Sequence, residues 1–94
     1  MFDGVSFDNL FWLNFREYLQ TQNTRSTVND RINYARRYYS MLLDDDLSEI
    51  LALSSDKRTH VMKALTSLSK FCGCYDYWKS MIKRYSLKWT YTTI

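Results

Sequence analysis

The sequence predicts an all-α fold, a compact bundle of four to five helices around one core. Its 94 residues are enough for a single domain. The chain has no proline and only two glycines, so it lacks most of the residues that separate strands and form hairpins. Hydrophobic residues make up 46% of the chain and aromatic residues 17%, which favours a dense core over disorder.

The first helix is expected from about Asp8 to Gln22. Apolar side chains recur there at helical spacing: Phe11, Phe15, Tyr18 and Leu19. Ser6 or Asp8 is expected to cap its start by accepting a hydrogen bond from a free backbone N–H. The polar run over residues 21–25 then interrupts the pattern.

The second predicted helix has the most regular pattern and opens at Ser26 or Thr27. Thr27 followed by Asp30 resembles a capping box, although its third position is usually Glu or Gln. Apolar residues then trace one stripe: Val28, Ile32, Ala35, Tyr39 and Leu42. The opposite side carries polar and charged residues: Asn29, Asn33, Arg36, Arg37 and Ser40.

Three consecutive acids, Asp44 to Asp46, end this helix and are expected to cap a short helix over Leu47–Leu53. A calcium loop would need further oxygen ligands at regular spacing, and none follows. We therefore interpret the three acids as capping and solvated residues. No cofactor and no metal are expected.

A fourth helix is expected from Asp56 to about Cys72, starting at Ser54 or Ser55, with Gly73 as a left-handed C-cap. Its apolar stripe consists of Val61, Ala64, Leu65, Leu68 and Phe71. Its other face contains no acid after Asp56 and reads Lys57, His60, Lys63, Ser67 and Lys70.

A fifth helix is expected from about Asp76 to Tyr85, followed by an extended tail over residues 86–94. The helix should bury Trp78, Met81 and Ile82 and leave three cations outside, Lys79, Lys83 and Arg84. The centre of the core is expected to contain Phe15, Leu19, Ile32, Tyr39, Leu65, Leu68 and Trp78.

The cysteines and the apolar runs exclude several classes of protein. Cys72 and Cys74 flank Gly73, so a disulfide would close a small strained loop, and two thiols cannot complete a tetrahedral zinc site. We interpret them as idle thiols in a reducing cytosol. No apolar run approaches the roughly 18–20 residues of a membrane span, and the N-terminus lacks the pattern of a signal peptide.

The sequence offers little for covalent catalysis. His60 is the only histidine, its neighbours along the helix are Asp56 and Lys63, and no carboxylate pair or glycine-rich phosphate loop is visible. We therefore expect that this chain is not an enzyme by itself.

The basic residues indicate a candidate surface for duplex DNA. The net charge of +3 is too small by itself to indicate binding to nucleic acid, so the arrangement of the charges matters more. Hydroxyl groups and a helix N-terminus suit phosphate oxygens, and long polar side chains can reach base edges. The candidate contacts are Arg25, Ser26, Thr27, Asn29, Arg36, Lys63, Ser67 and Lys70. The alternative interpretation is that these cations are the solvated backs of amphipathic helices.

Several segments resemble the N-terminal core-binding domain of tyrosine recombinases, and most nearly that of the archaeal integrases. The first helix contains an F-x-x-Y-L pattern, Phe15 to Leu19, and a polar link separates it from a helix opening with Ser26-Thr27. The later segment from Lys57 to Phe71 is similar to the family's K-x-x-x-x-x-L-x-x-F helix. The resemblance covers nearly the whole chain. Its motifs are moderately specific, because they consist mostly of core and capping positions.

The resemblance implies a SAM-like helical domain over residues 1–89 that binds double-stranded DNA, with residues 90–94 starting a linker. In that family a separate C-terminal domain cuts DNA with a tyrosine nucleophile, assisted by arginines, a histidine and a lysine. Nothing in this chain matches that set, so its partners would be DNA, a catalytic domain of the same protein and further protomers. A cytoplasmic, nucleoid-associated protein of an archaeal, viral or plasmid-borne element is implied.

Two other function classes stay open. A helical adaptor for protein–protein contacts would use exposed aromatic residues such as Trp12, Tyr77 or Trp89. A free-standing helix-turn-helix regulator is disfavoured, because the short third helix lacks a basic recognition face. Salt dependence separates DNA binding from an apolar adaptor interface, because only the former weakens steeply with salt.

Overall fold

The computed structural model describes residues 6–44 and 46–85, and every regular element in these two ranges is a helix, which confirms the all-α prediction. The helices are α1 (Asn9–Gln20), α2 (Arg25–Tyr38), α3 (Ser40–Asp44), α4 (Ser48–Leu51), α5 (Ser55–Cys72) and α6 (Tyr75–Arg84). The expected tail with Trp89, the linker over 90–94 and Asp45 lie outside the described residues.

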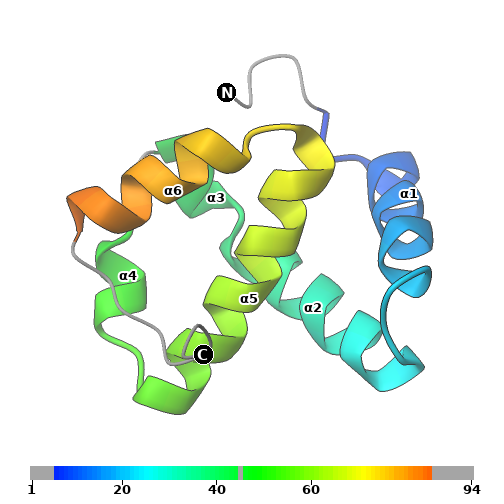
Figure 1. The fold of residues 1–94 in the computed structure, drawn as a ribbon, viewed down its shortest axis with the longest axis horizontal. Helices are drawn as coiled ribbons and strands as arrows, with labels where there is room; N and C mark the ends of the chain where they lie inside the picture. Colours follow the sequence, from blue (N-terminus) through cyan, green and yellow to red (C-terminus); the bar gives the residue numbers. More distant parts are fainter. Residues whose placement is uncertain (1–5, 45, 86–94) are drawn as a thin grey trace.

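The longest helix, α5, runs through the middle of the bundle (Figure 1). α1 and α2 lie on one side of it, and α4 and α6 lie on the other. The most extensive packing joins α2 to α5, although the two helices are separated in the sequence by α3 and α4. The bundle measures 33 × 29 × 22 Å.

The core consists mainly of the residues that the helical spacing predicted. Six of the seven expected central residues are at most 3% exposed: Phe15, Leu19, Ile32, Leu65, Leu68 and Trp78. The prediction for the seventh, Tyr39, is wrong, because this side chain is only half-buried, whereas its neighbour Tyr38 is 7% exposed. The helix stays regular up to Tyr39, whose N–H donates to the Ala35 carbonyl, and it breaks only after this residue. The Tyr39 ring packs at the edge of the core, with ring centres 4.5 Å from Phe7 and 5.7 Å from Trp12.

Three of the residues expected to cap the ends of helices do so. The Asp8 side chain accepts a hydrogen bond from the Phe11 N–H at 2.9 Å, and that of Ser54 accepts from Lys57 at 3.4 Å. Gly73 has a φ of 75°, and the backbone on either side of it closes the end of α5 as a left-handed cap.

The start of α2 differs from the prediction. The helix begins at Arg25 with Thr24 as its N-cap, so Thr27 and Asp30 lie inside the helix and form no capping box. The Thr27 hydroxyl instead accepts a hydrogen bond from the Thr24 hydroxyl at 3.1 Å.

The short helix before α5 is also shorter than expected, Ser48–Leu51 instead of 47–53. The Arg58 guanidinium of α5 donates to the carbonyls of Ile50, Leu51 and Leu53 at 3.2–3.3 Å, so these groups are satisfied without further helical turns. Its start follows the prediction more closely, because the Asp46 carboxylate accepts from the N–H and the hydroxyl of Ser48.

Two features are absent from the described residues, a membrane-spanning helix and a cluster of metal-binding side chains. No helix among them is long and apolar enough to cross a membrane. No group of three or more His, Cys, Asp or Glu side chains among them is placed to hold a metal ion.

Candidate nucleic-acid interface

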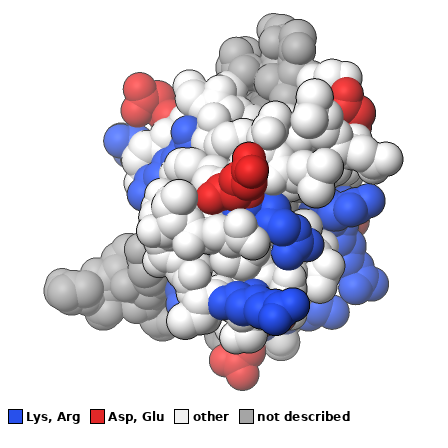
Figure 2. Space-filling view, turned by 90° about the vertical axis from the view of Figure 1, so that its right-hand side faces the viewer, with Lys and Arg blue, Asp and Glu red and all other residues white. Residues whose placement is uncertain are grey.

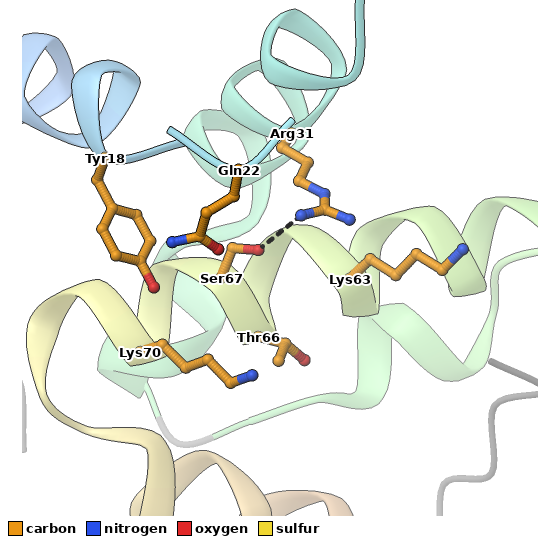
Figure 3. Close-up of a pocket in the computed structure, with 7 residues that line it drawn as sticks. All are labelled: Tyr18, Gln22, Arg31, Lys63, Thr66, Ser67 and Lys70. Atoms are coloured by element: carbon orange, nitrogen blue, oxygen red, sulfur yellow. Dashed lines mark hydrogen bonds between the residues drawn. The ribbon is translucent and has the colours of Figure 1, made fainter. Parts of the chain in front are cut away.

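A polar groove follows the contact between α2 and α5, and we call it the α2–α5 groove. It consists of two hollows that share Arg31 and Lys63. The first hollow, drawn in Figure 3, is lined by Tyr18, Gln22, Arg31, Lys63, Thr66, Ser67 and Lys70. The second is lined by Thr27, Asp30, Arg31, Tyr34, His60 and Lys63.

Helical spacing explains why these side chains line one groove. Thr27, Arg31 and Tyr34 follow one another at steps of four and three residues along α2, which places them on one face. Along α5 the positions 63, 67 and 70 repeat the same steps. The stripes beside them are apolar and buried, so packing α2 onto α5 brings the two polar rows together at the rim of the core.

Arg31 connects the two helices across the groove. One guanidinium nitrogen donates to the Ser67 hydroxyl at 3.2 Å, over 36 residues of sequence (Figure 3). Both side chains are partly buried, and an arginine has five N–H donors, of which this bond uses one. The bond therefore directs a cation into the groove and leaves it able to donate to an anion.

Positive charge dominates the first hollow. Its lining includes Arg31, Lys63 and Lys70 and contains no carboxylate, whereas the second hollow includes Asp30. A concave surface with one sign of charge concentrates counter-ions of the opposite sign. The arrangement can therefore hold an anion, and the first hollow is better suited to it than the second.

The surroundings of the groove are also basic. Arg37 and Lys57 line a neighbouring depression together with Asp30. On the side of the molecule where α1 and α2 lie, Lys and Arg side chains gather mainly over the lower half and right edge of the view, and acidic side chains are scattered (Figure 2). Cations of α2 and α5 thus extend beyond the two hollows.

Four of the eight predicted contact residues lie in the α2–α5 groove: Thr27, Lys63, Ser67 and Lys70. Arg25 and Ser26 are exposed in the first turn of α2. The remaining two, Asn29 and Arg36, do not reach the groove.

Asn29 and Arg36 lie on the side of α2 that faces α1. The Arg16 guanidinium donates to the Asn29 side-chain oxygen at 2.8 Å, and the Arg36 guanidinium lies 5.7 Å from the centre of the Trp12 ring. Asn29 follows the groove residue Thr27 by two positions, and Arg36 follows Tyr34 by two positions. Because two residues turn an α-helix by about 200°, both side chains lie on the side of α2 opposite to the groove.

The sequence reasoning missed Arg31, the residue that connects the two hollows. It belongs neither to the apolar stripe of α2 nor to the exposed polar side, because it is partly buried at the boundary between them. Its position four residues after Thr27 was the available signal. Tyr18, Gln22 and Tyr34 were missed as groove residues in the same way.

Lys70 and His60 are both partly engaged by aromatic rings. The Lys70 ammonium lies 5.0 Å from the centre of the Tyr75 ring, and Lys79 approaches the same ring at 5.1 Å. The His60 ring lies parallel to Tyr34, with 6.0 Å between their centres. A cation over a ring keeps its charge, so Lys70 still contributes to the positive hollow.

The two cysteines are unbridged, as the sequence predicted. Burial raises the pKa of the Cys72 thiol to about 11, with a smaller contribution from Cys74 beside it. A thiol with such a pKa is almost entirely protonated at neutral pH and is a poor nucleophile or metal ligand.

Comparison of the chain with models of protein families, with curated proteins and with solved structures found no match.

Proposed function

We propose that this chain is a duplex-DNA-binding domain that lays the α2–α5 groove against the sugar-phosphate backbone. The observation that carries the proposal is the first hollow, in which three cations from two helices line a concave surface without a carboxylate. Phosphate contacts supply most of the affinity of non-specific DNA binding, and such a surface provides them.

The contacts would have different roles. Arg31, Lys63 and Lys70 would neutralise phosphates, while the Thr27 and Ser67 hydroxyls would donate to phosphate oxygens and fix the register. Arg25 and Ser26 extend this surface along the first turn of α2.

Base reading by Asn29 and Arg36 fits the structure less well than phosphate binding by the groove. Asn29 already accepts from Arg16, and Arg36 stacks on Trp12, so either would have to give up its present partner. We therefore propose that this surface positions DNA and contributes little to direct reading of the sequence.

Within this proposal the chain acts as the core-binding half of a tyrosine recombinase. The proposal rests on the sequence resemblance, namely the F-x-x-Y-L pattern from Phe15 to Leu19 and the order of the elements expected from the sequence. A separate catalytic domain of the same protein would then cut and rejoin DNA, with further protomers on the same site. Such a recombinase would act in the cytoplasm on the DNA of an archaeal host, virus or plasmid.

Fluorescence anisotropy with a labelled duplex at low salt tests the proposal. Lys63→Ala and Lys70→Ala should each weaken binding and reduce the slope of log affinity against log salt by about 0.9, the value for one phosphate contact. Lys79→Ala is the matched control, because Lys79 contacts the same Tyr75 ring as Lys70 but lies outside both hollows.

The result that contradicts the proposal is equal weakening by all three substitutions, which would indicate diffuse attraction instead of a defined surface. Absence of duplex binding by the unaltered chain at low salt would contradict it as well.

A protein–protein adaptor is the second candidate, and one observation favours it. Leu10 and Leu13 on α1 are 65% and 59% exposed, more than any other large apolar residue in the described part of the chain. Two of the three aromatic residues expected to mark such an interface do not support it, because Trp12 is buried and Tyr77 is half-buried with its hydroxyl bonded to the Leu42 carbonyl. The third, Trp89, lies outside the described residues.

A helix-turn-helix regulator is disfavoured further. α3 and α4, which lie between the two long helices α2 and α5, have only five and four residues. A recognition helix in the major groove needs several exposed side chains along its N-terminal turns. Neither short helix contains a basic residue.

A further inference from the structure

We propose that the first hollow of the α2–α5 groove is a discrete site for one phosphate group, which binds free phosphate as well as a phosphate of DNA. We call it the phosphate site and define it by Tyr18, Gln22, Arg31, Ser67 and Lys70. It deepens the proposed function, because in DNA binding a backbone phosphate would occupy it.

Hydrogen-bond donors reach this site from four parts of the chain (Figure 3). Tyr18 comes from α1, Gln22 from the link after it, and Arg31 from α2. Ser67 and Lys70 come from α5. A phosphate group has several acceptor oxygens pointing in different directions, so donors arranged around a hollow suit it better than a flat basic surface does.

Much of the site is rigid before any anion arrives. The Tyr18 ring packs against Phe15 and Phe71, with ring centres 6.3 and 5.2 Å away, and this packing holds the phenol in place. The Arg31–Ser67 bond fixes the guanidinium in the same way. Donors that are already ordered lose little conformational entropy when the ligand binds, which raises affinity.

The shape and the charge of the hollow agree with a small anion. Its volume is about 140 Å³, well above the space that one water molecule needs. No carboxylate is among the described residues that line it, whereas Asp30 lines the second hollow, so the lining of the first hollow itself adds no negative charge that opposes an anion.

The test is a titration of the isotope-labelled chain followed by amide chemical shifts in two-dimensional NMR. Sodium phosphate is added at pH 7 against sodium chloride at matched ionic strength. We expect saturable shifts at Gln22, Ser67 and Lys70 with phosphate only. A second arm adds a short duplex to the same sample, so that free phosphate and DNA phosphate are compared at the same amides.

Two variants and a matched control decide whether the site is specific. Arg31→Met keeps an unbranched side chain of similar helix propensity and removes its charge. It should weaken phosphate binding at least about tenfold, since a hydrogen bond between charged groups contributes that much. Arg37→Met makes the same change on the exposed side of α2 and should leave the affinity within about twofold. Ser67→Ala, which suits a helix, should weaken binding several-fold and decides the question if Arg31→Met does not fold.

The outcomes separate this inference from the proposed function. Shifts that grow linearly with phosphate, or equal effects of Arg31→Met and Arg37→Met, would overturn the phosphate site even where the duplex still binds. Saturable phosphate binding without any duplex binding would support the site and contradict the proposed function.

Discussion

Two buried hydroxyl groups on α5 should respond to deletion in opposite directions. Thr66 and Ser69 lie three residues apart, and both are buried. The Thr66 hydroxyl donates to the Met62 carbonyl and accepts from the Trp78 indole N–H, each at 2.8 Å. The Ser69 hydroxyl is buried and has no hydrogen-bond partner among the described residues. We expect Thr66→Val to destabilise the fold and Ser69→Ala to stabilise it.

The expected magnitudes follow from the partners. Thr66→Val keeps the shape of the side chain and leaves the Trp78 N–H without an acceptor in a fully buried position, which costs about 1–3 kcal/mol. Valine and threonine have similar helix propensities, so propensity adds little. Ser69→Ala removes a desolvated group and inserts the best helix former, for a gain of about 1 kcal/mol.

Urea unfolding followed by circular dichroism measures both changes, provided that the slope with urea is the same for all variants. Thr66→Val should also lower the melting temperature by roughly 10 °C in a domain of this size. Thr66→Ser is the control, because it keeps the oxygen that accepts from Trp78 and loses only a methyl group. Destabilisation of equal size by Thr66→Val and Ser69→Ala would show that packing, and not hydrogen bonding, decides the stability at these positions.

Three further outcomes follow from single residues. Gly73→Ala should destabilise the fold by about 1–2 kcal/mol through backbone strain alone, because φ is 75° and nothing lies within 4 Å of the added Cβ; thermal melts check this. Burial raises the pKa of Cys72 to about 11, against 9.0 for a free thiol. The contribution of the protonated thiol to the free energy of unfolding is therefore fully present below pH 9 and is lost as the pH rises towards 11. The unfolding free energy of Cys72→Ala should fall less than that of the unaltered chain in this range. Hydrogen bonds from Ser48, the backbone one first, lower the pKa of Asp46 below 3.8, so its contribution is present above that pH and is lost as the pH falls through the lowered value. The stability difference between Asp46→Ala and the unaltered chain should therefore shrink in acid, and a difference that persists at the lowest pH would refute this.

The sequence determined the helices because their signals are local. The apolar stripe of α5 that includes Leu65 and Leu68, the Asp8 cap and the Gly73 cap each depend on residues within a few positions of one another. Local hydrogen bonds and helical periodicity form the same pattern in any all-α fold, so they can be read without knowing which helices pack together.

The sequence also predicted part of the candidate site. Thr27 was expected at the N-terminal end of the second helix, and Lys63, Ser67 and Lys70 on the polar face of the fourth. The structure brings these four residues to one groove. The sequence could not predict that these residues meet, because α2 and α5 come together through contacts between residues far apart in the chain. One such contact is the Arg31–Ser67 hydrogen bond, which spans 36 positions.

Tertiary structure alone decided what each polar residue touches. Arg36 appeared equivalent to the groove cations in the sequence, yet the packing of α1 against α2 places it over Trp12. The same packing places Asn29 against Arg16, and Tyr38 is buried where the periodicity favoured Tyr39. The physical reason is that periodicity fixes the angle of a side chain around its own helix, whereas the neighbour at that angle depends on which helix packs there.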